Sequence, residues 1–516
     1  MDILFREGSA KKINELPKET VKDLAIDEII DYMTDVSEDA KILKHIITRL
    51  PADLSDMRYR QDILKDLMNS DELCEDLRSM IDHIKVLKYY RGVKNAQRDD
   101  SDSLFSLLEQ LRELSSYVDI IDALGRTLSG HEITSEGLVA LRDHIKSIEA
   151  DPDYQKVKPD IIKIHEDLSN VRGALVGVNF TPDLNVSEVS IVEFLPCATV
   201  PKYNIVDMLT GTAPLTGGTM KKTDPLMASM APRLEKHLRK QYLAMKKTMT
   251  RYSGYDSRFL IEMYEGLLFY ISAATLGKKL RSRGYEISFP DLTPSDDHLI
   301  RMEDLYNIRL AIAGEKEIVK NDMEFTDKEK MFILTGPNRG GKTVIEQALG
   351  IISIMASSGM FVTAKHFSGV PFAKIYTHFP IDENLTINYG RLGEEAVRIK
   401  EIVKSSDKDT LILFNETFST TSAADALYLS KDLLHILKDK GSSVIFNTHI
   451  HELAQDIPGM NKWDGESDIV SIVMEIRDNV NTFKIKRSAP DTSSYASNIA
   501  RKYGITYEQM SDLIPT

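Results

Sequence analysis

The stretch MFILTGPNRGGKTVIEQALGIISIM, residues 331–355, decides the fold of the C-terminal half of this chain. Its apolar run Met331–Gly336 is typical of a buried strand, and Val344–Met355 is typical of a helix. Between them, Gly336–Thr343 satisfies the pattern G-x-x-x-x-G-K-[ST]. Glycines in that pattern let backbone N–H groups and the helix N-terminus point at phosphate oxygens. The order of strand, loop and helix therefore predicts a phosphate-binding loop.

Every residue of this loop is a candidate nucleotide-binding residue: Gly336, Pro337, Asn338, Arg339, Gly340, Gly341, Lys342 and Thr343. Lys342 would reach the β- and γ-phosphates, which also makes it a candidate catalytic residue. The hydroxyl of Thr343 would ligate Mg²⁺. The cofactors predicted from these residues are ATP and Mg²⁺.

Two further apolar strands, Thr410–Asn415 and Ser443–Thr448, each lead into polar residues. At the carboxyl edge of a parallel sheet these residues would lie beside the phosphate loop. Glu416 would then orient or deprotonate the attacking water, and His449 would sense or polarise the γ-phosphate. Asn415 stands where such sites usually carry an Asp for Mg²⁺. Because an amide is a neutral and weaker ligand, we expect reduced metal affinity and hydrolysis, and the enzymatic activity predicted is a Mg²⁺-dependent ATPase.

The wider pattern predicts a multidomain chain. Short apolar runs alternate with helical segments after Pro290, which indicates a mostly parallel, doubly wound α/β domain over 291–516. Upstream, residues 25–170 and 226–283 have helical periodicity. Residues 171–194 carry β-branched residues and a Thr-Pro-Asp turn, which predict a short hairpin. We therefore expect an all-α region over 1–290 with a small β insertion at about 171–225.

The composition is that of a soluble globular protein, with 42% hydrophobic and 28% charged residues. We expect a cytoplasmic protein without a membrane span, because there is no signal-like N-terminus and no apolar run of about 18 residues. The two cysteines fit a reducing compartment. The net charge of −14 confines any nucleic-acid surface to a local basic patch.

One such patch is the basic segment Lys221–Arg251. Its candidate nucleic-acid-binding residues are Lys221, Lys222, Arg233, Lys236, Arg239, Lys240, Lys246 and Lys247. This excess of cations could neutralise phosphates at the tip of a clamp or lever. A solvated helix face has the same composition, and both interpretations stay open.

The nucleotide-site motifs resemble those of the MutS family of mismatch-repair ATPases. ILTGPNRGGKT (333–343) is similar to the family's TGPNxGGKS loop. NETFSTTSAADA (415–426) looks like its DExGRGTSxxDG segment, and THIHELA (448–454) looks like ATHYHEL. The shared order of these motifs extends the likeness over about 291–516, and implies a P-loop NTPase domain of the ABC/MutS type.

Three flanking segments add to this resemblance. IVKNDMEF (318–325) is similar to the family's adenine-binding segment, which makes Asn321 a candidate base contact and places Ile318 where an aromatic ring usually stacks. SSYASNIARKYGI (493–505) is similar to the family's S-Y-G helix. RYRQDIL (58–64) is similar to the opening of the MutS core domain, so the upstream helices would be core and lever helices.

The resemblance implies an ATPase that dimerises through its ATPase domains and couples nucleotide state to binding of DNA or another nucleic acid. Two departures limit the transfer. The chain is expected to begin at the core domain, without the mismatch-reading and connector domains. In the segment Gly390–Glu395, Leu392 cannot supply the serine that the family gives to its partner's nucleotide. We therefore expect a nucleic-acid structure, rather than a mismatched base, as the substrate.

An interpretation from a different class stays open. The acidic net charge, Asn415 and the missing reader domain favour a nucleotide-gated interaction protein that hydrolyses ATP slowly or not at all. Its partner would be a protein or a ribonucleoprotein.

Overall fold

The computed structural model describes residues 2–96, 104–169, 173–195, 236, 238–252, 254–255, 257–294, 299–380, 391–465, 467–478, 480–489, 504 and 510. The chain divides into two compact units. Unit 1 comprises Glu75–Thr134 and Leu138–Tyr264, and unit 2 comprises Asp2–Cys74, Ser135–Gly137 and Glu265–Thr516. The domain division expected at residue 290 stays a prediction.

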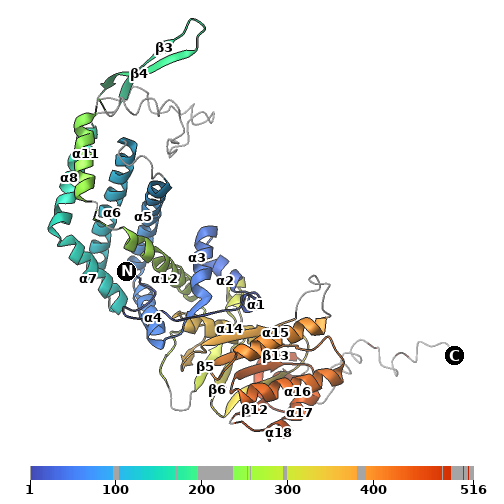
Figure 1. The fold of residues 1–516 in the computed structure, drawn as a ribbon. Helices are drawn as coiled ribbons and strands as arrows, with labels where there is room; N and C mark the ends of the chain where they lie inside the picture. Colours follow the sequence, from blue (N-terminus) through green and yellow to red (C-terminus); the bar gives the residue numbers. More distant parts are fainter. Residues whose placement is uncertain are drawn as a thin grey trace. The chain divides into compact units, whose positions relative to one another are not determined.

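The described part of unit 1 consists of helices and one hairpin (Figure 1). Its helices, wholly or in part, are α5 (Asp71–Ala96), α6 (Leu104–Gly130), α7 (Glu136–Glu149), α8 (Pro152–Ser169), α11 (Arg239–Arg251) and α12 (Arg258–Ser282). Helices α6, α8 and α11 pack against one another. The ring of Tyr255 lies 5.7 Å from those of Tyr117 and Tyr252 and 6.2 Å from that of Tyr154. The predicted helical character of this region is confirmed.

The hairpin consists of β3 (Gly173–Phe180) and β4 (Val186–Leu195), paired antiparallel with Val178 opposite Val189. At its turn the Thr181 N–H donates to the Asn185 carbonyl at 2.8 Å. The hairpin predicted from the sequence is therefore confirmed. The rest of the expected insertion, residues 196–225, lies outside the described residues.

The main sheet of unit 2 has six strands in the order β13-β12-β7-β11-β10-β9. These are β7 (Glu329–Thr335), β9 (Lys374–His378), β10 (Thr410–Asn415), β11 (Ser443–Asn447), β12 (Asp468–Arg477) and β13 (Val480–Arg487). All neighbouring pairs are parallel except β12 and β13. The prediction of a mostly parallel α/β sheet is confirmed, and the three predicted strands are β7, β10 and β11.

Helices cover both faces of this sheet (Figure 1). Helix α14 (Lys342–Ser357) packs on one face, where an added Cβ at Gly350 would lie 2.9 Å from Cδ1 of Leu413. On the other face, α15 (Arg391–Ser405), α16 (Ala423–Asp439), α17 (His451–Gln455) and α18 (Ile457–Met460) bury Ile412 and Phe414. Successive strand residues point to opposite faces, so a strand buried on both faces is apolar throughout.

A second, three-stranded sheet in unit 2 was not predicted. It consists of β6 (Asn321–Phe325), β5 (Ile300–Leu305) and β8 (His366–Ser368), all antiparallel, and α13 (Ile308–Ala313) lies between β5 and β6 in sequence. Its strands are short and mix charged with apolar residues, so they lack the long apolar runs that identified β7, β10 and β11.

The N-terminal segment of unit 2 packs on the α/β sheet. It comprises β1 (Ile13–Glu15), α1 (Lys18–Asp23), α2 (Ile26–Met33), α3 (Ser37–Ile47), β2 (Arg49–Pro51) and α4 (Leu54–Asn69), with β1 and β2 paired antiparallel. Helix α1 lies against the edge strand β9. Asp23 accepts hydrogen bonds from Thr377 Oγ1, at 2.7 Å, and from the guanidinium of Arg398. Gln347 Nε2, on α14, donates to the backbone oxygen of Asp23 at 2.8 Å.

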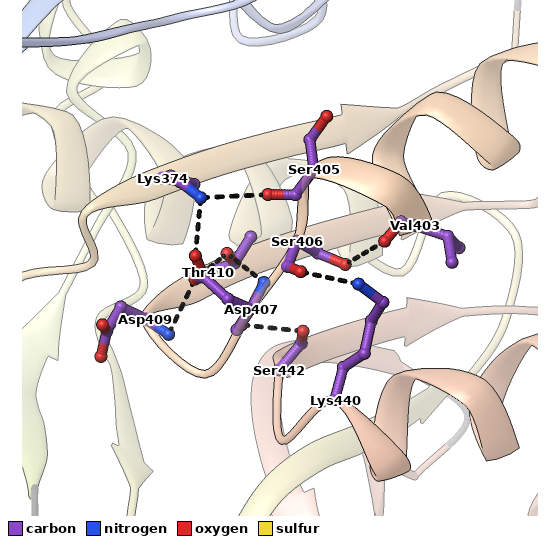
Figure 2. A network of polar contacts seen from close by, with 9 residues as sticks. All are labelled: Lys374, Val403, Ser405, Ser406, Asp407, Asp409, Thr410, Lys440 and Ser442. Atoms are coloured by element: carbon purple, nitrogen blue, oxygen red, sulfur yellow. Dashed lines mark hydrogen bonds and ion pairs between the residues drawn. The ribbon is translucent and has the colours of Figure 1, made fainter.

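A polar network fixes the amino ends of β9, β10 and β11, at the edge away from the glycine-rich loop (Figure 2). Asp407 accepts hydrogen bonds from Lys374 Nζ at 2.6 Å and from Thr410 Oγ1 at 2.8 Å. Ser442 Oγ donates to the Asp407 carbonyl at 2.9 Å. Burial alone would raise the pKa of Asp407, but the Lys374 and Thr410 hydrogen bonds outweigh it and lower that pKa. These contacts hold the amino ends of the three strands together, and so help to fix the strands whose carboxyl ends lie beside the glycine-rich loop.

Among the described residues, helix α12 is long and apolar enough to meet a membrane-span criterion, with a mean hydropathy of 1.3. No such segment was expected from the sequence. Of the apolar window, 72% is buried inside the protein, and core helices meet the same criterion. The helix is therefore weak support for a membrane span.

Candidate nucleotide-binding site

The glycine-rich loop joins β7 to α14 through left-handed backbone positions. Gly336 has a φ of 149°, Arg339 of 60° and Gly341 of 92°. A Cβ on Gly336 would lie 2.8 Å from Cβ of Met474 on β12, so glycine avoids both a clash and strain. Gly341 is the N-cap of α14, a helix of 16 residues, and it leaves the first helical N–H groups without a side-chain cap. These N–H groups can receive an anion.

Lys342 is folded back onto this loop. Its Nζ donates to the carbonyl oxygens of Gly336, at 3.0 Å, and Pro337, at 3.2 Å. The side chain is buried, and burial lowers the pKa of Lys342, although the charges of Glu416 and Glu346 oppose this shift. Two carbonyl oxygens are weak partners for a buried ammonium group. Lys342 can therefore exchange them for phosphate oxygens.

The structure brings the two predicted metal ligands together. Thr343 Oγ1 donates to Asn415 Oδ1 at 3.4 Å. The same oxygen accepts a shorter hydrogen bond, of 2.6 Å, from Nδ2 of Asn447. Asn447 occupies the end of β11 beside Asn415, where the two strands are in register. A hydroxyl and an amide oxygen are ligands that Mg²⁺ accepts, in a set without formal charge.

Glu416 and His449 meet at the same edge. Glu416 follows β10 in a left-handed conformation with a φ of 51°, and its backbone N–H donates to the Asn447 carbonyl at 2.9 Å. His449 Nε2 lies 2.8 Å from Glu416 Oε1. This hydrogen bond is the main reason that the pKa of Glu416 is lowered. A left-handed non-glycine residue stores about 1–3 kcal/mol of strain, and such strain gathers at functional sites.

The two residues predicted to contact adenine, Asn321 and Ile318, have different surroundings. Asn321 is buried and tied to β13, because Nδ2 donates to the Phe483 carbonyl at 3.1 Å and Oδ1 accepts from the Ile485 N–H at 2.7 Å. Ile318 is half-buried in the connection before β6. A Cβ on Gly341 would lie 3.1 Å from Cδ1 of Phe483, so that exposed ring borders the loop. Phe483 was not among the predicted site residues, because its exposure on β13 is visible only in the structure.

Two more residues of the site were missed. Glu346, one turn after Lys342, and Asn447 are fully buried at 0% exposure. Asn447 Nδ2 lies 3.3 Å from Glu346 Oε2. Burial raises the pKa of Glu346 well above its usual range, and the hydrogen bond from Asn447 opposes this only in part. Asn447 begins the polar segment that contains His449 but was assigned no role, and Glu346 lies outside the motifs. Their contact joins positions 101 residues apart, which no local pattern predicts.

The nucleic-acid candidates lie in unit 1 or outside the described residues. Lys221, Lys222 and Arg233 are outside them. The described candidates Lys236, Arg239, Lys240 and Lys247 are exposed, and Lys246 is half-buried. Arg251, at the end of the same helix α11, pairs with Asp160 at 2.8 Å. An exposed basic face on α11 is compatible with both interpretations of this segment.

Comparisons with known proteins give matches to the C-terminal region of the chain. Residues 332–512 match the family model described as MutS domain V. The chain is 29% identical over 199 residues to "Endonuclease MutS2" of Staphylococcus haemolyticus, covering 38% of this chain and 24% of that protein. It is 31% identical over 151 residues to "Endonuclease MutS2" of Clostridium kluyveri, covering 29% and 19%. It is 30% identical over 160 residues to "DNA mismatch repair protein MutS" of Bacillus velezensis, covering 31% and 19%. The matched part is thus at most about a quarter of these relatives' length.

Proposed function

We propose that this chain, which belongs to the MutS family through its C-terminal α/β domain, binds ATP with Mg²⁺ and uses the bound nucleotide to control binding of a nucleic acid. One observation carries the proposal. The loop Gly336–Thr343, the carboxylate of Glu416 and the imidazole of His449 converge at one edge of the sheet. In this proposal the domain is a P-loop NTPase of the ABC/MutS type.

Phosphate binding would use groups that are already positioned. The N–H groups of the loop and of the first turn of α14 would donate to phosphate oxygens. Lys342 would leave the carbonyls of Gly336 and Pro337 and move to the β- and γ-phosphates. Burial strengthens this pairing, because a charge pair interacts more strongly in a low-dielectric environment.

The metal site fits Mg²⁺ by its donor set. Thr343 and Asn415 present a hydroxyl and an amide oxygen within 3.4 Å of each other. Thr343 and Asn415 would hold Mg²⁺, and the positive charge supplied there would offset that of the phosphates. Because Asn415 carries no charge, we expect a weaker site than one with an aspartate.

Hydrolysis would depend on Glu416. Its lowered pKa keeps the carboxylate ionised at neutral pH, as a group that orients or deprotonates a water must be. His449 holds one carboxylate oxygen at 2.8 Å, which fixes the carboxylate and leaves its other oxygen available to the water. A γ-phosphate near His449 would compete for that imidazole, so the His449–Glu416 contact can report on the nucleotide.

For the base, we propose that Phe483 forms part of the adenine pocket together with Ile318. Its exposed ring borders Gly341, at the end of the phosphate loop. Asn321 would contact adenine only if it gave up a hydrogen bond to β13, so its first role in this proposal is to position Phe483 through the backbone oxygen of that residue.

Two further steps extend the proposal. Two copies of the chain would close on each other through their ATPase domains when nucleotide binds, and the helical region would carry this change to a nucleic-acid surface on α11, a surface that includes Arg239 and Lys240. The second candidate function is a nucleotide-gated interaction protein that hydrolyses ATP slowly or not at all, with a protein or ribonucleoprotein partner. Asn415 is the observation that favours this second function.

The test compares the full chain with Lys342→Ala and Glu416→Gln. We expect Lys342→Ala to lose binding of a fluorescent ATP analogue, and Glu416→Gln to bind it but to hydrolyse ATP more slowly. Wild type that hydrolyses ATP no faster than Glu416→Gln supports the second function.

Titration with duplex, branched and single-stranded nucleic acids, with and without ATP, tests the nucleotide-controlled binding of a nucleic acid. Arg239→Gln and Lys240→Gln should each weaken binding and reduce its salt dependence. No binding at low salt would refute the nucleic-acid role.

A further inference from the structure

The inside of the metal site holds a carboxyl group that the nucleotide motifs do not include. Glu346 lies on α14, with Oε2 3.3 Å from Asn447 Nδ2, and Asn447 Nδ2 lies 2.6 Å from Asn415 Oδ1. Asn415 Oδ1 in turn accepts from Thr343 Oγ1. A chain of polar contacts therefore leads from Glu346 through Asn447 to both candidate metal ligands.

This chain has unused hydrogen-bonding capacity. Within the described part of the protein, Glu346 Oε1 and Asn447 Oδ1 are both buried without a hydrogen-bond partner. Each side chain is fully buried, at 0% exposure. Burying a carboxyl group and leaving acceptors unsatisfied is unfavourable, so packing gives no account of Glu346. Acceptors without donors beside two metal ligands fit the outer side of a hydrated cation, whose waters are donors.

We propose that Glu346 is a positioning residue of this metal site: it holds Asn447, which in turn holds the ligand Asn415, and it becomes the carboxylate of the site when a bound cation favours its ionised form. The proposal rests on the proposed function, because it assumes that Mg²⁺ binds beside Thr343 and Asn415 with the nucleotide. In this proposal the carboxylate lies on α14 instead of at the end of β10, and Asn447 connects it to Asn415. Outer partners of this kind orient the ligands and set the affinity of a metal site.

Two charge arrangements make the proposal specific. With Asn415 neutral, Glu346 is the carboxylate that the contact chain connects to the cation. With Asn415→Asp, two carboxyl groups would share the site, and the like charges would disfavour ionisation of both. Asn415→Asp combined with Glu346→Gln would return the site to one carboxylate, now at the position where such sites usually carry it.

The experiment measures binding of a fluorescent, non-hydrolysable ATP analogue to the full chain during Mg²⁺ titration, with an EDTA baseline. We expect Glu346→Gln to raise the Mg²⁺ concentration for half-maximal binding by about 10- to 100-fold, the usual effect of losing an outer-shell partner. Asn415→Asp with Glu346→Gln should return it to within about threefold of wild type. Ser353→Ala, a buried hydroxyl change two turns further along α14, is the matched control and should leave it unchanged.

The outcomes separate the two proposals. Wild type that binds the analogue equally in Mg²⁺ and EDTA would refute the metal-dependent function itself. Wild type that depends on Mg²⁺, with Glu346→Gln matching it, would overturn the role of Glu346 alone. A loss in Glu346→Gln that is equal in Mg²⁺ and EDTA would make Glu346 merely structural and would also overturn it. If Glu346→Gln does not fold, the double variant decides: a Mg²⁺ requirement like that of wild type supports the proposal, and a requirement raised at least tenfold overturns it.

Discussion

One nearly buried ion pair helps to hold the N-terminal segment of unit 2 on the α/β sheet. Asp23, at the end of α1, accepts from Arg398 on α15 and from Thr377 Oγ1 on β9. The same guanidinium donates to the Thr377 carbonyl at 2.8 Å. The side chains of Asp23 and Arg398 are only 10% and 15% exposed. Asp23→Ala would therefore leave a nearly buried guanidinium without its carboxylate.

Removing one partner from a buried ion pair costs about 3–5 kcal/mol. Since this pair keeps slight contact with solvent, we expect Asp23→Ala to lower the free energy of unfolding by about 3 kcal/mol. The matched control is Asp27→Ala on the neighbouring helix α2. Asp27 pairs with Lys44 at 2.7 Å, but these side chains are 56% and 47% exposed. An exposed pair of this kind contributes about 0.2–1 kcal/mol.

Unfolding can be followed in unit 2 specifically, because Trp463 is the only tryptophan in the chain. It packs beside the core of the α/β domain, with its ring 4.6 Å from that of His435. Denaturant titration followed by Trp463 fluorescence should give losses that differ by at least about 2 kcal/mol between the two variants. Equal losses for Asp23→Ala and Asp27→Ala would refute the inference that burial makes the Asp23–Arg398 pair more stabilising than the Asp27–Lys44 pair.

Two predictions concern pH. Burial, with the charge of Arg398 adding to it, lowers the pKa of His378 to about 4, so the folded state keeps it neutral while the unfolded state protonates below the ordinary value. This stability is present above that ordinary value and is lost as pH falls toward 4. Wild type should lose about 2 kcal/mol more than His378→Asn between about pH 7.5 and pH 5 in Trp463-monitored unfolding, and equal losses would contradict the assignment. His449→Ala removes the main cause that lowers the pKa of Glu416, so the acid limb of the ATPase pH profile should move to higher pH. An unmoved limb would show that Glu416 does not control it.

The sequence predicted those strands of the fold that consist of continuous apolar runs. Strand β10 has the predicted bounds, Thr410–Asn415, and β7 and β11 differ from theirs by at most two residues. Strands buried on both faces must be apolar throughout, and the polar residue that ends such a strand is easily recognised. For this reason Asn415, Glu416 and His449 could be placed at one edge before any coordinates.

Contacts between distant segments could not be predicted in this way. Asn321 was a candidate for adenine, but β13 contacts its amide from a position more than 160 residues later. Glu346 is the one acidic residue of α14, and an acidic side chain usually faces solvent. Whether such a residue is exposed depends on which strand lies beneath it, and the neighbour here is Asn447. Local pattern carries no information on that pairing.

Glu346 also changes how the substitution at Asn415 should be interpreted. If position 415 is considered alone, an amide in place of a carboxylate predicts weaker Mg²⁺ binding and slower ATP hydrolysis. Metal affinity depends, however, on the charge within a few ångströms of the cation and on the groups that orient its ligands. The contacts from Glu346 through Asn447 to Asn415 connect a carboxyl group on a different element of the fold to one of the proposed ligands. Asn415 therefore predicts slow hydrolysis only if Glu346 makes no contribution to metal binding. Glu346→Gln, and Asn415→Asp combined with Glu346→Gln, measure that contribution directly.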